Sequence, residues 1–433
     1  MEYMFKKGSQ IDITCEKMIF GGQALGRIDG KIALLWGALA GETVQACIIK
    51  NKKSYVEGIV QKVITSSRHR ISAEEDHFLC CSPWQIMSFD EENEWKKRIA
   101  LELYHNIIPL LSNKIDLIAD CQGSYHYRNK MEYSFCNDSA GRLSLAFYNR
   151  GSHTKKPITP CKLALPCLNN TAQKIVQWLD QHKFPVRSLK SLIVRGNEYG
   201  HTIAALFIKD RVSILKSPAI DEQLKGLQIY YSYPRSPASR PDELLLNKGQ
   251  DFIETEINTA QLKYGLLSFF QINRDLFIKV INDIKGFLDP QKRLIDFYAG
   301  VGAISIPLYK YCKSCVLVEN NEQAVQYARE NIINNNVLHY SVKLLSTEKA
   351  LDHISPENIL IFDPPRSGLH KNIIGRILEA KPFRIIYLSC NFATHARDIQ
   401  LILEDYKITF FRLYNFFPRT PHIEALCILD RKG

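Results

Sequence analysis

The stretch "RLIDFYAGVGAISI", from Arg293 to Ile306, decides the fold expected for this chain. An apolar run typical of a buried strand ends at a loop whose glycines permit a tight turn, and a segment of helical length follows. The same order of strand and helix recurs around the runs "SCVLVEN", "ENILIFDPP" and "RIIYLSC". This alternation predicts an α/β domain with a mostly parallel sheet covered by helices on both faces.

Two other compositional regions precede this domain. From about residue 8 to 68, short alternating runs broken by "GGQALGRIDG" and "GALAGE" predict a small β-barrel of the oligonucleotide-binding (OB) type. One hairpin of the barrel is rich in basic residues. It is either a nucleic-acid contact or a solvated hairpin tip, and the barrel sequence leaves both open; the residues are Lys50, Lys52, Lys53 and Tyr55. From about residue 69 to 263, an amphipathic helix and strands of antiparallel type predict a central α+β region.

Charge and composition indicate the kind of partner, the cellular compartment and the state of the cysteines. The chain has 56 Lys and Arg against 45 Asp and Glu, a net charge of +11 that suits a polyanionic partner such as RNA without requiring one. The N-terminal residues lack the apolar run of a signal peptide and no stretch has the length of a membrane span, so we expect a cytoplasmic protein with no membrane partner. The 12 cysteines show no disulfide framework and should be reduced thiols.

The loop after the first strand of the α/β domain predicts a nucleoside site. Gly300 lets the backbone approach a ligand closely, and Glu319, at the end of the next strand, can accept two ribose hydroxyls. The third glycine of the dinucleotide fingerprint is missing. The pattern therefore favours S-adenosylmethionine, an adenosine cofactor without phosphates.

Asp363 follows another strand, in the run "DPPR". Pro364 and Pro365 stiffen the loop and would hold the carboxylate at the cofactor cleft, although a rigid loop with a capping aspartate is the alternative. Arg366 stands where amino-directed methyltransferases carry an aromatic residue, which argues against adenine N6 chemistry.

Cys390 and Glu424 make chemical sense together. A cysteine at a strand end is usually inert, but Cys390 ends its strand at the ligand-binding edge of the sheet. A thiolate that adds to C6 of uracil makes C5 nucleophilic toward a sulfonium methyl group, and a base must then remove the C5 proton. The pair predicts uracil-C5 methylation with Cys390 as nucleophile and Glu424 as general base.

Six motifs in order give the chain a resemblance to the RNA uracil-5-methyltransferase family over essentially its whole length. They are "SFFQINR" at 268–274, "DFYAGVGAISI" at 296–306, "VEN" at 318–320, "DPPRSGL" at 363–369, "YLSCNFATHARDI" at 387–399 and "FFPRTPHIEAL" at 416–426. The resemblance implies a Rossmann-like class I methyltransferase domain and an N-terminal OB-like barrel that the family calls a TRAM domain. It also implies that Gln271, Tyr298, Glu319 and Asp363 contact S-adenosylmethionine, and that Arg397 and Asp398 are scaffolding.

The family also folds an early helix against its catalytic domain. We therefore expect a TRAM barrel over 1–68, a central RNA-binding domain over 69–89 and 115–266, and a methyltransferase domain over 90–114 and 267–433. We expect a monomer.

One departure concerns iron. Family members that bind a [4Fe-4S] cluster carry C-x5-C-x2-C after the barrel and a fourth cysteine in the central domain. Here Glu75, Cys81 and Trp84 take the first three positions, and Cys161 matches the fourth. Because two of four thiolates do not hold such a cluster, we expect no metal and a space filled by Trp84 and apolar groups, with Cys80 and Cys167 as the possible substitute thiols.

The N-terminal barrel suggests which RNA is the substrate. Within the family a TRAM barrel points to 23S ribosomal RNA more than to the tRNA T-loop, and the target uridine must leave its stack to reach the nucleophile. The T-loop uridine of tRNA and a catalytically weak RNA-binding or ribosome-assembly factor remain as alternatives. A cytosine-5 enzyme would need a second catalytic cysteine, and "SCN" at 389–391 does not match one.

Overall fold

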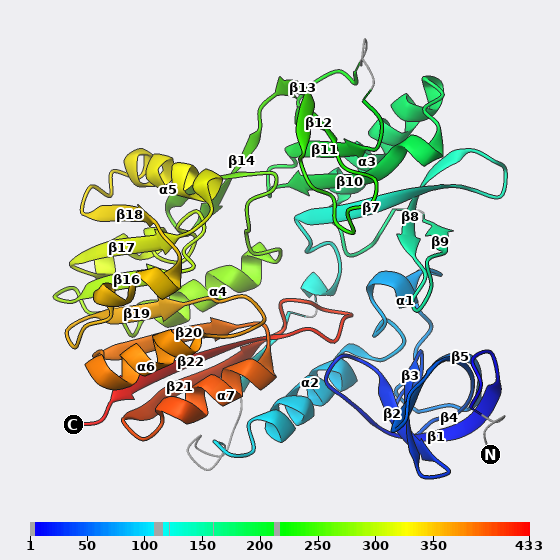
Figure 1. The fold of residues 1–433 in the computed structure, drawn as a ribbon, viewed down its shortest axis with the longest axis horizontal. Helices are drawn as coiled ribbons and strands as arrows, with labels where there is room; N and C mark the ends of the chain where they lie inside the picture. The colour runs from blue at the N-terminus through cyan, green and yellow to red at the C-terminus, as the bar shows by residue number, and fades with distance from the viewer. Residues whose placement is uncertain (1–4, 108–115, 121, 159, 212–216) are drawn as a thin grey trace.

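The computed structural model describes residues 5–107, 116–120, 122–158, 160–211 and 217–433, which form three connected parts (Figure 1). The domain boundary expected at 114–115 lies outside the described residues, as does the end of the early helix expected over 90–114.

The first part is a closed five-stranded barrel with the strand order β1-β2-β3-β5-β4. Its strands alternate buried and exposed side chains, so that Ile11, Ile13 and Cys15 of the first strand fill the barrel core. This confirms the predicted N-terminal barrel. The strands are β1 (Gln10–Met18), β2 (Ala24–Ile28), β3 (Lys31–Trp36), β4 (Thr43–Asn51) and β5 (Tyr55–Thr65).

Two helices connect the barrel to the rest of the chain: α1 (Phe78–Cys81) and α2 (Phe89–Leu103). The α2 helix begins at Ser88, whose hydroxyl accepts a hydrogen bond from the Glu91 amide at 3.4 Å. One side of α2 packs Trp95 into the barrel core, while Ala100 packs into the core of the α/β domain. The helix therefore fixes the barrel against the α/β domain.

The central part is a seven-stranded sheet in the order β13-β12-β11-β10-β7-β8-β9, mostly antiparallel, with β11 and β12 parallel. Helix α3 (Pro166–Gln181) packs on it, and the hairpin β14–β15 leads on to the α/β domain. The strands are β7 (Lys130–Asn137), β8 (Leu143–Tyr148), β9 (Lys155–Pro157), β10 (Leu189–Gly196), β11 (Thr202–Ile208), β12 (Leu224–Tyr231), β13 (Glu243–Gly249), β14 (Phe252–Ile257) and β15 (Ala260–Gly265).

The third part is an eight-stranded sheet in the order β18-β17-β16-β19-β20-β22-β21-β6. Its first five strands in this order are parallel, and β22 runs antiparallel to β20. Edge strand β6 comes from far earlier in the chain, a pairing that the sequence did not predict. The strands are β6 (Asp116–Ile118), β16 (Arg293–Phe297), β17 (Ser314–Glu319), β18 (Tyr340–Leu344), β19 (Ile359–Phe362), β20 (Arg384–Ser389), β21 (Tyr406–Tyr414) and β22 (Glu424–Arg431).

Helices cover both faces of this sheet (Figure 1). Neighbouring strand residues point to opposite faces, so Leu294 joins the core under α4 and α5, and Ile295 joins the core under α6 and α7. This confirms the predicted α/β fold. The helices are α4 (Arg274–Lys285), α5 (Glu322–Asn334), α6 (Lys371–Ala380) and α7 (Phe392–Ile402), and short 3-10 turns lie at η2 (Gln122–Ser124), η3 (Val186–Ser188), η4 (Ile306–Tyr311), η5 (Thr347–Lys349) and η6 (Leu351–His353).

Among the described residues, no helix is both long and apolar enough to cross a bilayer.

Candidate active site

The carboxyl ends of the parallel strands bring the predicted site residues to one edge of the sheet. Tyr298 follows β16, Glu319 ends β17, Asp363 follows β19 and Cys390 follows β20. Strand β22 runs the opposite way, so its first residue, Glu424, lies at the same edge. This edge is where open α/β sheets bind ligands.

Cys390 and Glu424 are neighbours across two strands. Ser389 of β20 pairs with Ala425 of β22, so the next position of the antiparallel ladder sets Cys390 opposite Glu424. Residues that face each other in such a ladder project to the same side and lie within contact distance. The register thus delivers a thiol and a carboxyl to one place.

A cavity of about 500 Å³ opens at this edge, within the range of small-molecule sites. Its lining includes all seven residues that the sequence analysis assigned to catalysis and cofactor binding: Gln271, Tyr298, Gly300, Glu319, Asp363, Cys390 and Glu424. The tertiary fold therefore brings together side chains that are up to 153 positions apart, from Gln271 to Glu424.

The cofactor end of the cavity is built from the loop after β16. Tyr298 and Gly300 both have left-handed backbones, with φ of 59° and 55°, and strain of this kind in a residue other than glycine is typical of functional sites. A β-carbon at Gly300 would meet nothing closer than the Phe269 carbonyl at 4.0 Å, so there is open space beside the backbone. A ligand can therefore come close to this loop.

Glu319 ties that loop to the next strand. Its carboxylate accepts hydrogen bonds from the backbone amides of Gly300 at 2.9 Å and of Asn320 and Asn321 at 2.8 Å. A carboxylate has about four lone-pair positions, so acceptor capacity is left for a ribose hydroxyl. This arrangement fits the adenosine part of S-adenosylmethionine.

Asp363 and Gln271 join two of the motifs. The Gln271 amide donates to Asp363 Oδ2 at 3.0 Å, which fixes the loop before α4 against the loop after β19. Burial, and then the charge of Asp296, raise the pKa of Asp363 to about 7, while the bond from Gln271 opposes this shift. Because β19 lies between β16 and β20 in the sheet, Asp363 lies between the cofactor end and the cysteine.

The thiol and carboxyl share one electrostatic environment. Burial, and then the charges of Glu424 and Asp363, raise the pKa of Cys390 to about 11, whereas Arg366 lowers it. Burial also raises the pKa of Glu424 well above its usual range, and Asp363 adds to this effect. Glu424 is only 3% exposed, and its Oε2 atom makes no hydrogen bond within the described residues. Such a carboxyl holds a proton more tightly than an ordinary glutamate does.

The helix after Cys390 supports the loop that carries Asp363. Asn391 caps α7 through the Ala393 amide and donates its own amide to the Arg366 carbonyl at 2.8 Å. Asp398 accepts from the Leu369 amide at 2.8 Å and from the Tyr387 hydroxyl at 2.9 Å. These contacts agree with the scaffolding role expected of Asp398.

The loop before Glu424 is held by α2. Both carboxylate oxygens of Glu92 lie within 3.1 Å of the Arg419 amide, and the buried Lys96 ammonium donates to Glu92 at 2.7 Å and to Asn415 at 2.6 Å. Arg419 has a φ of 64°. The sequence analysis missed Glu92 and Lys96, because nothing in a surface-patterned helix shows which charged residues the tertiary fold will bury.

Other cavity residues were also missed. Arg366, Phe417 and His422 line it, together with Phe269 and Ile272. Burial, and then the charge of Arg366, lower the pKa of His422 to about 4, so this imidazole is neutral at physiological pH. The available signal was their position inside the motifs that supply Gln271, Asp363 and Glu424.

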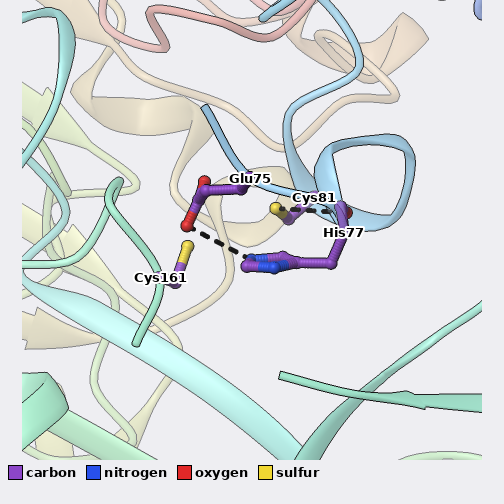
Figure 2. Close-up of side chains that lie close together, drawn as sticks. All are labelled: Glu75, His77, Cys81 and Cys161. Atoms are coloured by element: carbon purple, nitrogen blue, oxygen red, sulfur yellow. Dashed lines mark hydrogen bonds and ion pairs between the residues drawn. The ribbon is translucent and has the colours of Figure 1, made fainter. Parts of the chain in front are cut away.

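The expected iron-sulfur positions contain a different set of side chains (Figure 2). Glu75, Cys81 and Cys161 lie together as predicted, but His77 joins them. Trp84 packs into the barrel core and donates its indole N–H to the Gly22 carbonyl at 3.0 Å, so the expectation that it fills this space was wrong. With two thiolates, the described residues do not match a [4Fe-4S] cluster.

Cys80 lies outside this group. Its thiol is 3.8 Å from the Asn149 side-chain oxygen, so it is turned away from Cys81 and Cys161 and does not supply a third thiolate. The eleven cysteines that the structure describes are free thiols.

Comparison with known proteins gives one family and several similar chains. The tRNA (uracil-5-)-methyltransferase family model matches residues 96–432. The chain is 28% identical to a 23S rRNA (uracil(1939)-C(5))-methyltransferase, RlmD, of Marinomonas posidonica, covering 96% of this chain and 94% of the relative. It is 26% identical to an uncharacterised RNA methyltransferase of Fusobacterium nucleatum, with 99% and 97% covered.

A solved structure has the same fold. The tRNA (uracil-54, C5)-methyltransferase of Pyrococcus abyssi, in complex with S-adenosyl-L-homocysteine, superposes with a TM-score of 0.79 at 20% identity. The match covers 97% of this chain and 100% of that chain, so it includes the barrel and the central sheet as well as the α/β domain.

Proposed function

Because this chain belongs to the tRNA (uracil-5-)-methyltransferase family, and so is an S-adenosylmethionine-dependent RNA uracil-C5 methyltransferase, we propose that it modifies a uridine of 23S ribosomal RNA. Family membership confirms the enzyme class, the RNA partner and the methyl donor predicted from the sequence. The observation that carries the proposed mechanism is that Cys390 and Glu424 line one cavity together with Glu319, directly beyond the Ser389–Ala425 pair of β20 and β22.

The cofactor end of the cavity has the groups that the methyl donor needs. Glu319 would accept a ribose hydroxyl, Gly300 and Tyr298 would lie against the adenosine, and Gln271 and Asp363 would border the amino-acid end. When bound, S-adenosylmethionine supplies an electrophilic methyl group. The chain's own contribution is to orient this group toward Cys390 and Glu424.

Cys390 starts the reaction in this proposal. The thiol loses its proton to solvent and its sulfur bonds to C6 of the uracil, which moves the electron pair of the C5–C6 double bond toward C5 and O4. C5 then takes the methyl group. The pKa of about 11 means that little thiolate exists in the free protein at neutral pH, and the Arg366 cation is the nearby group that favours it.

Glu424 completes the cycle. Its carboxylate takes the proton from C5, the C5–C6 double bond re-forms and the bond between the Cys390 sulfur and C6 breaks. A buried carboxyl with a raised pKa is a stronger base than an exposed glutamate, which suits this step.

The choice of RNA rests on the relatives. The 28% identical relative with nearly complete coverage of both chains is an enzyme of 23S rRNA. The barrel itself does not discriminate, because a tRNA enzyme has the same three-part fold over 97% of this chain. A uridine in the T-loop of tRNA is therefore the second candidate, and both substrates belong in the same test.

The test uses 23S rRNA fragments and tRNA that contain 5-fluorouridine, incubated with the protein and S-adenosylmethionine. Fluorine at C5 cannot leave as a proton, so the protein should remain bound to the RNA as a band on a denaturing gel. We expect the band with 23S rRNA and its absence with Cys390→Ala. A band with tRNA alone would overturn the substrate proposal. No band with either RNA, while RNA and cofactor still bind, would overturn the mechanism and favour a binding factor.

A further inference from the structure

A second group of reactive side chains lies apart from the cavity, between α1 and the loop that precedes α3. Glu75, His77, Cys81 and Cys161 each offer one ligand atom, and these atoms lie within 4.8 Å of one another (Figure 2). Three of the four residues are buried and Cys81 is partly buried. Two stretches of the chain meet here, since Cys161 lies far along the sequence from residues 75–81.

The buried His77 imidazole has no hydrogen-bond partner among the described residues of this group. The residue is 1% exposed, yet neither ring nitrogen makes a hydrogen bond to a described residue. Its Nε2 atom lies 3.3 Å from Glu75 Oε1, at the centre of the group. Buried polar atoms are nearly always satisfied, because leaving one without a partner costs about 1–3 kcal/mol. The ring nitrogens lie at ion-pair distance from Glu75, at 3.3 Å, and from Asp76, at 3.5 Å. A buried imidazole beside two thiols and a carboxylate that still makes no hydrogen bond to a described residue indicates a ligand.

The donor set selects the kind of ligand. Two sulfurs, one imidazole nitrogen and one carboxylate oxygen are ligand types that Zn²⁺ takes in closed, four-coordinate sites. Bond lengths of about 2.0–2.3 Å place tetrahedral ligands about 3.3–3.8 Å apart, so small inward movements of the side chains would complete such a site. A [4Fe-4S] cluster, by contrast, is held by four thiolates.

We propose that Glu75, His77, Cys81 and Cys161 bind a single zinc ion with a structural role. The ion would satisfy the imidazole and join residues 75–81 to the loop that precedes α3. This goes beyond the proposed methylation, which makes no use of the four residues.

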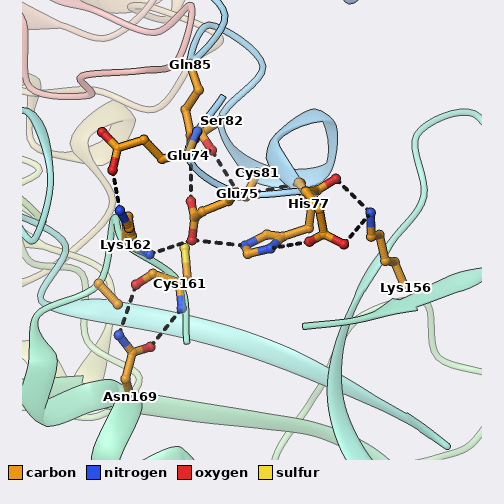
Figure 3. A network of polar contacts seen from close by, with 12 residues as sticks. Glu74, Glu75, His77, Cys81, Ser82, Gln85, Lys156, Cys161, Lys162 and Asn169 are labelled. Carbon is orange, nitrogen blue, oxygen red and sulfur yellow. Dashed lines mark hydrogen bonds and ion pairs between the residues drawn. The ribbon is translucent and has the colours of Figure 1, made fainter. Parts of the chain in front are cut away.

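The surroundings of the group hold the ligands in place (Figure 3). Glu75 accepts from the Lys162 amide at 2.7 Å and from the Gln85 side chain at 2.6 Å. The Asn169 side chain bonds both the amide and the carbonyl of Cys161, at 3.1 and 3.0 Å. Hydrogen bonds to the ligand residues of this kind orient them and are part of a metal site.

An ion at this position would also stabilise a contact with the active-site loop. A few residues after Cys81, the Trp84 amide donates to the Arg419 carbonyl at 3.1 Å, on the loop that leads to Glu424. Fixing residues 75–81 to the central domain would therefore also steady a contact with the active-site loop.

The test measures metal content, which is independent of methyl transfer. The full-length protein is purified under nitrogen without chelator, and zinc, iron and acid-labile sulfide are quantified. We expect about one zinc per chain and no stoichiometric sulfide, with zinc lost in His77→Ala and Cys161→Ser. Cys80→Ser is the matched control, since it removes the adjacent thiol from outside the group, and it should keep the ion, as should Cys390→Ala.

Each contrary result is decisive. Equal zinc in wild type and Cys161→Ser means an adventitious ion only, and iron with equimolar sulfide means a cluster; either overturns the proposal. Because Cys161→Ser could fail to fold, wild-type protein is also stripped and loaded with Co²⁺. A tetrahedral spectrum with thiolate-to-cobalt charge transfer is expected, together with a higher melting temperature on adding Zn²⁺. Absence of the charge-transfer band overturns the proposal.

Discussion

The cavity and the group around His77 contain the same kinds of side chain in opposite surroundings. Cys390 lies at an open strand edge, where burial and two carboxyl groups raise its pKa to about 11. Cys161 lies in closed packing, where the neighbouring Cys81 thiol and His77 imidazole lower its pKa against the opposing effect of burial. The difference shows that a cysteine's role is set by its neighbours and by whether it faces free space.

The largest expected effect separates these thiols by activity. We expect Cys390→Ala to lower kcat/KM for methyl transfer to RNA by at least about 10⁴-fold, because the attacking atom is removed. Cys80→Ser lies in neither group and should stay within about twofold of wild type. Transfer of labelled methyl from S-adenosylmethionine measures both. If Cys390→Ala kept an activity within tenfold of wild type, Cys390 would not be the nucleophile.

Glu424→Gln tests the carboxyl beside the nucleophile. We expect kcat to fall by about 10³-fold, since proton removal from C5 loses its base. Ordinary RNA should then stay attached to Cys390 after methylation and give a band on a denaturing gel. The double variant with Cys390→Ala is the control and should give none. Near-normal turnover without the band would assign proton removal to another group.

The pH dependence of Cys390 reactivity tests its environment directly. Below the pKa of about 11, the thiolate fraction grows with pH, so alkylation of Cys390 by iodoacetamide should rise about tenfold per pH unit between pH 7 and 10. Peptide mass spectrometry identifies the site, and Arg366→Gln should reduce labelling at each pH because a favourable charge is removed. A rate that levels off near pH 8 would contradict the raised pKa.

The smallest expected effect concerns Glu319, which resembles Glu75 in accepting backbone amides but lines the open cavity. Glu319→Gln should weaken binding of S-adenosylhomocysteine about tenfold, as expected for one lost charge-assisted hydrogen bond. Calorimetry measures the affinity. Turnover at saturating cofactor should change much less, and an unchanged affinity would place the ribose elsewhere.

Local patterns were sufficient for much of the fold and the cavity. The alternation of apolar runs with helix-length segments predicts parallel strands, and their carboxyl ends necessarily meet at one edge. That rule alone placed Glu319, Asp363 and Cys390 near one another. Glu424 was paired with Cys390 on chemical grounds, because uracil-C5 methylation needs a base, and the antiparallel direction of β22 that brings it to this edge is not visible in its sequence.

Long-range burial was not predictable in the same way. Trp84 and Cys81 are three positions apart, yet one packs into the barrel core and the other turns toward the central domain. Lys96 and Glu92 have the spacing of a surface ion pair but are buried against the loop that carries Arg419. Such outcomes depend on which elements pack together, and spacing along the chain does not record that.

The sequence by itself therefore determined which residues end the strands at the cavity. The strands are recognised by their apolar runs and the loops by their turn residues, and both are local features of the sequence. Only the tertiary structure decided that His77 joins Glu75, Cys81 and Cys161, because the direction in which a side chain next to a short helix points depends on what packs against that helix. It alone also placed β6 at the sheet edge and showed that α2, which the resemblance had set against the catalytic domain, packs on the barrel as well. The physical reason is the same in each case: contacts between distant segments are selected by total burial, not by local pattern.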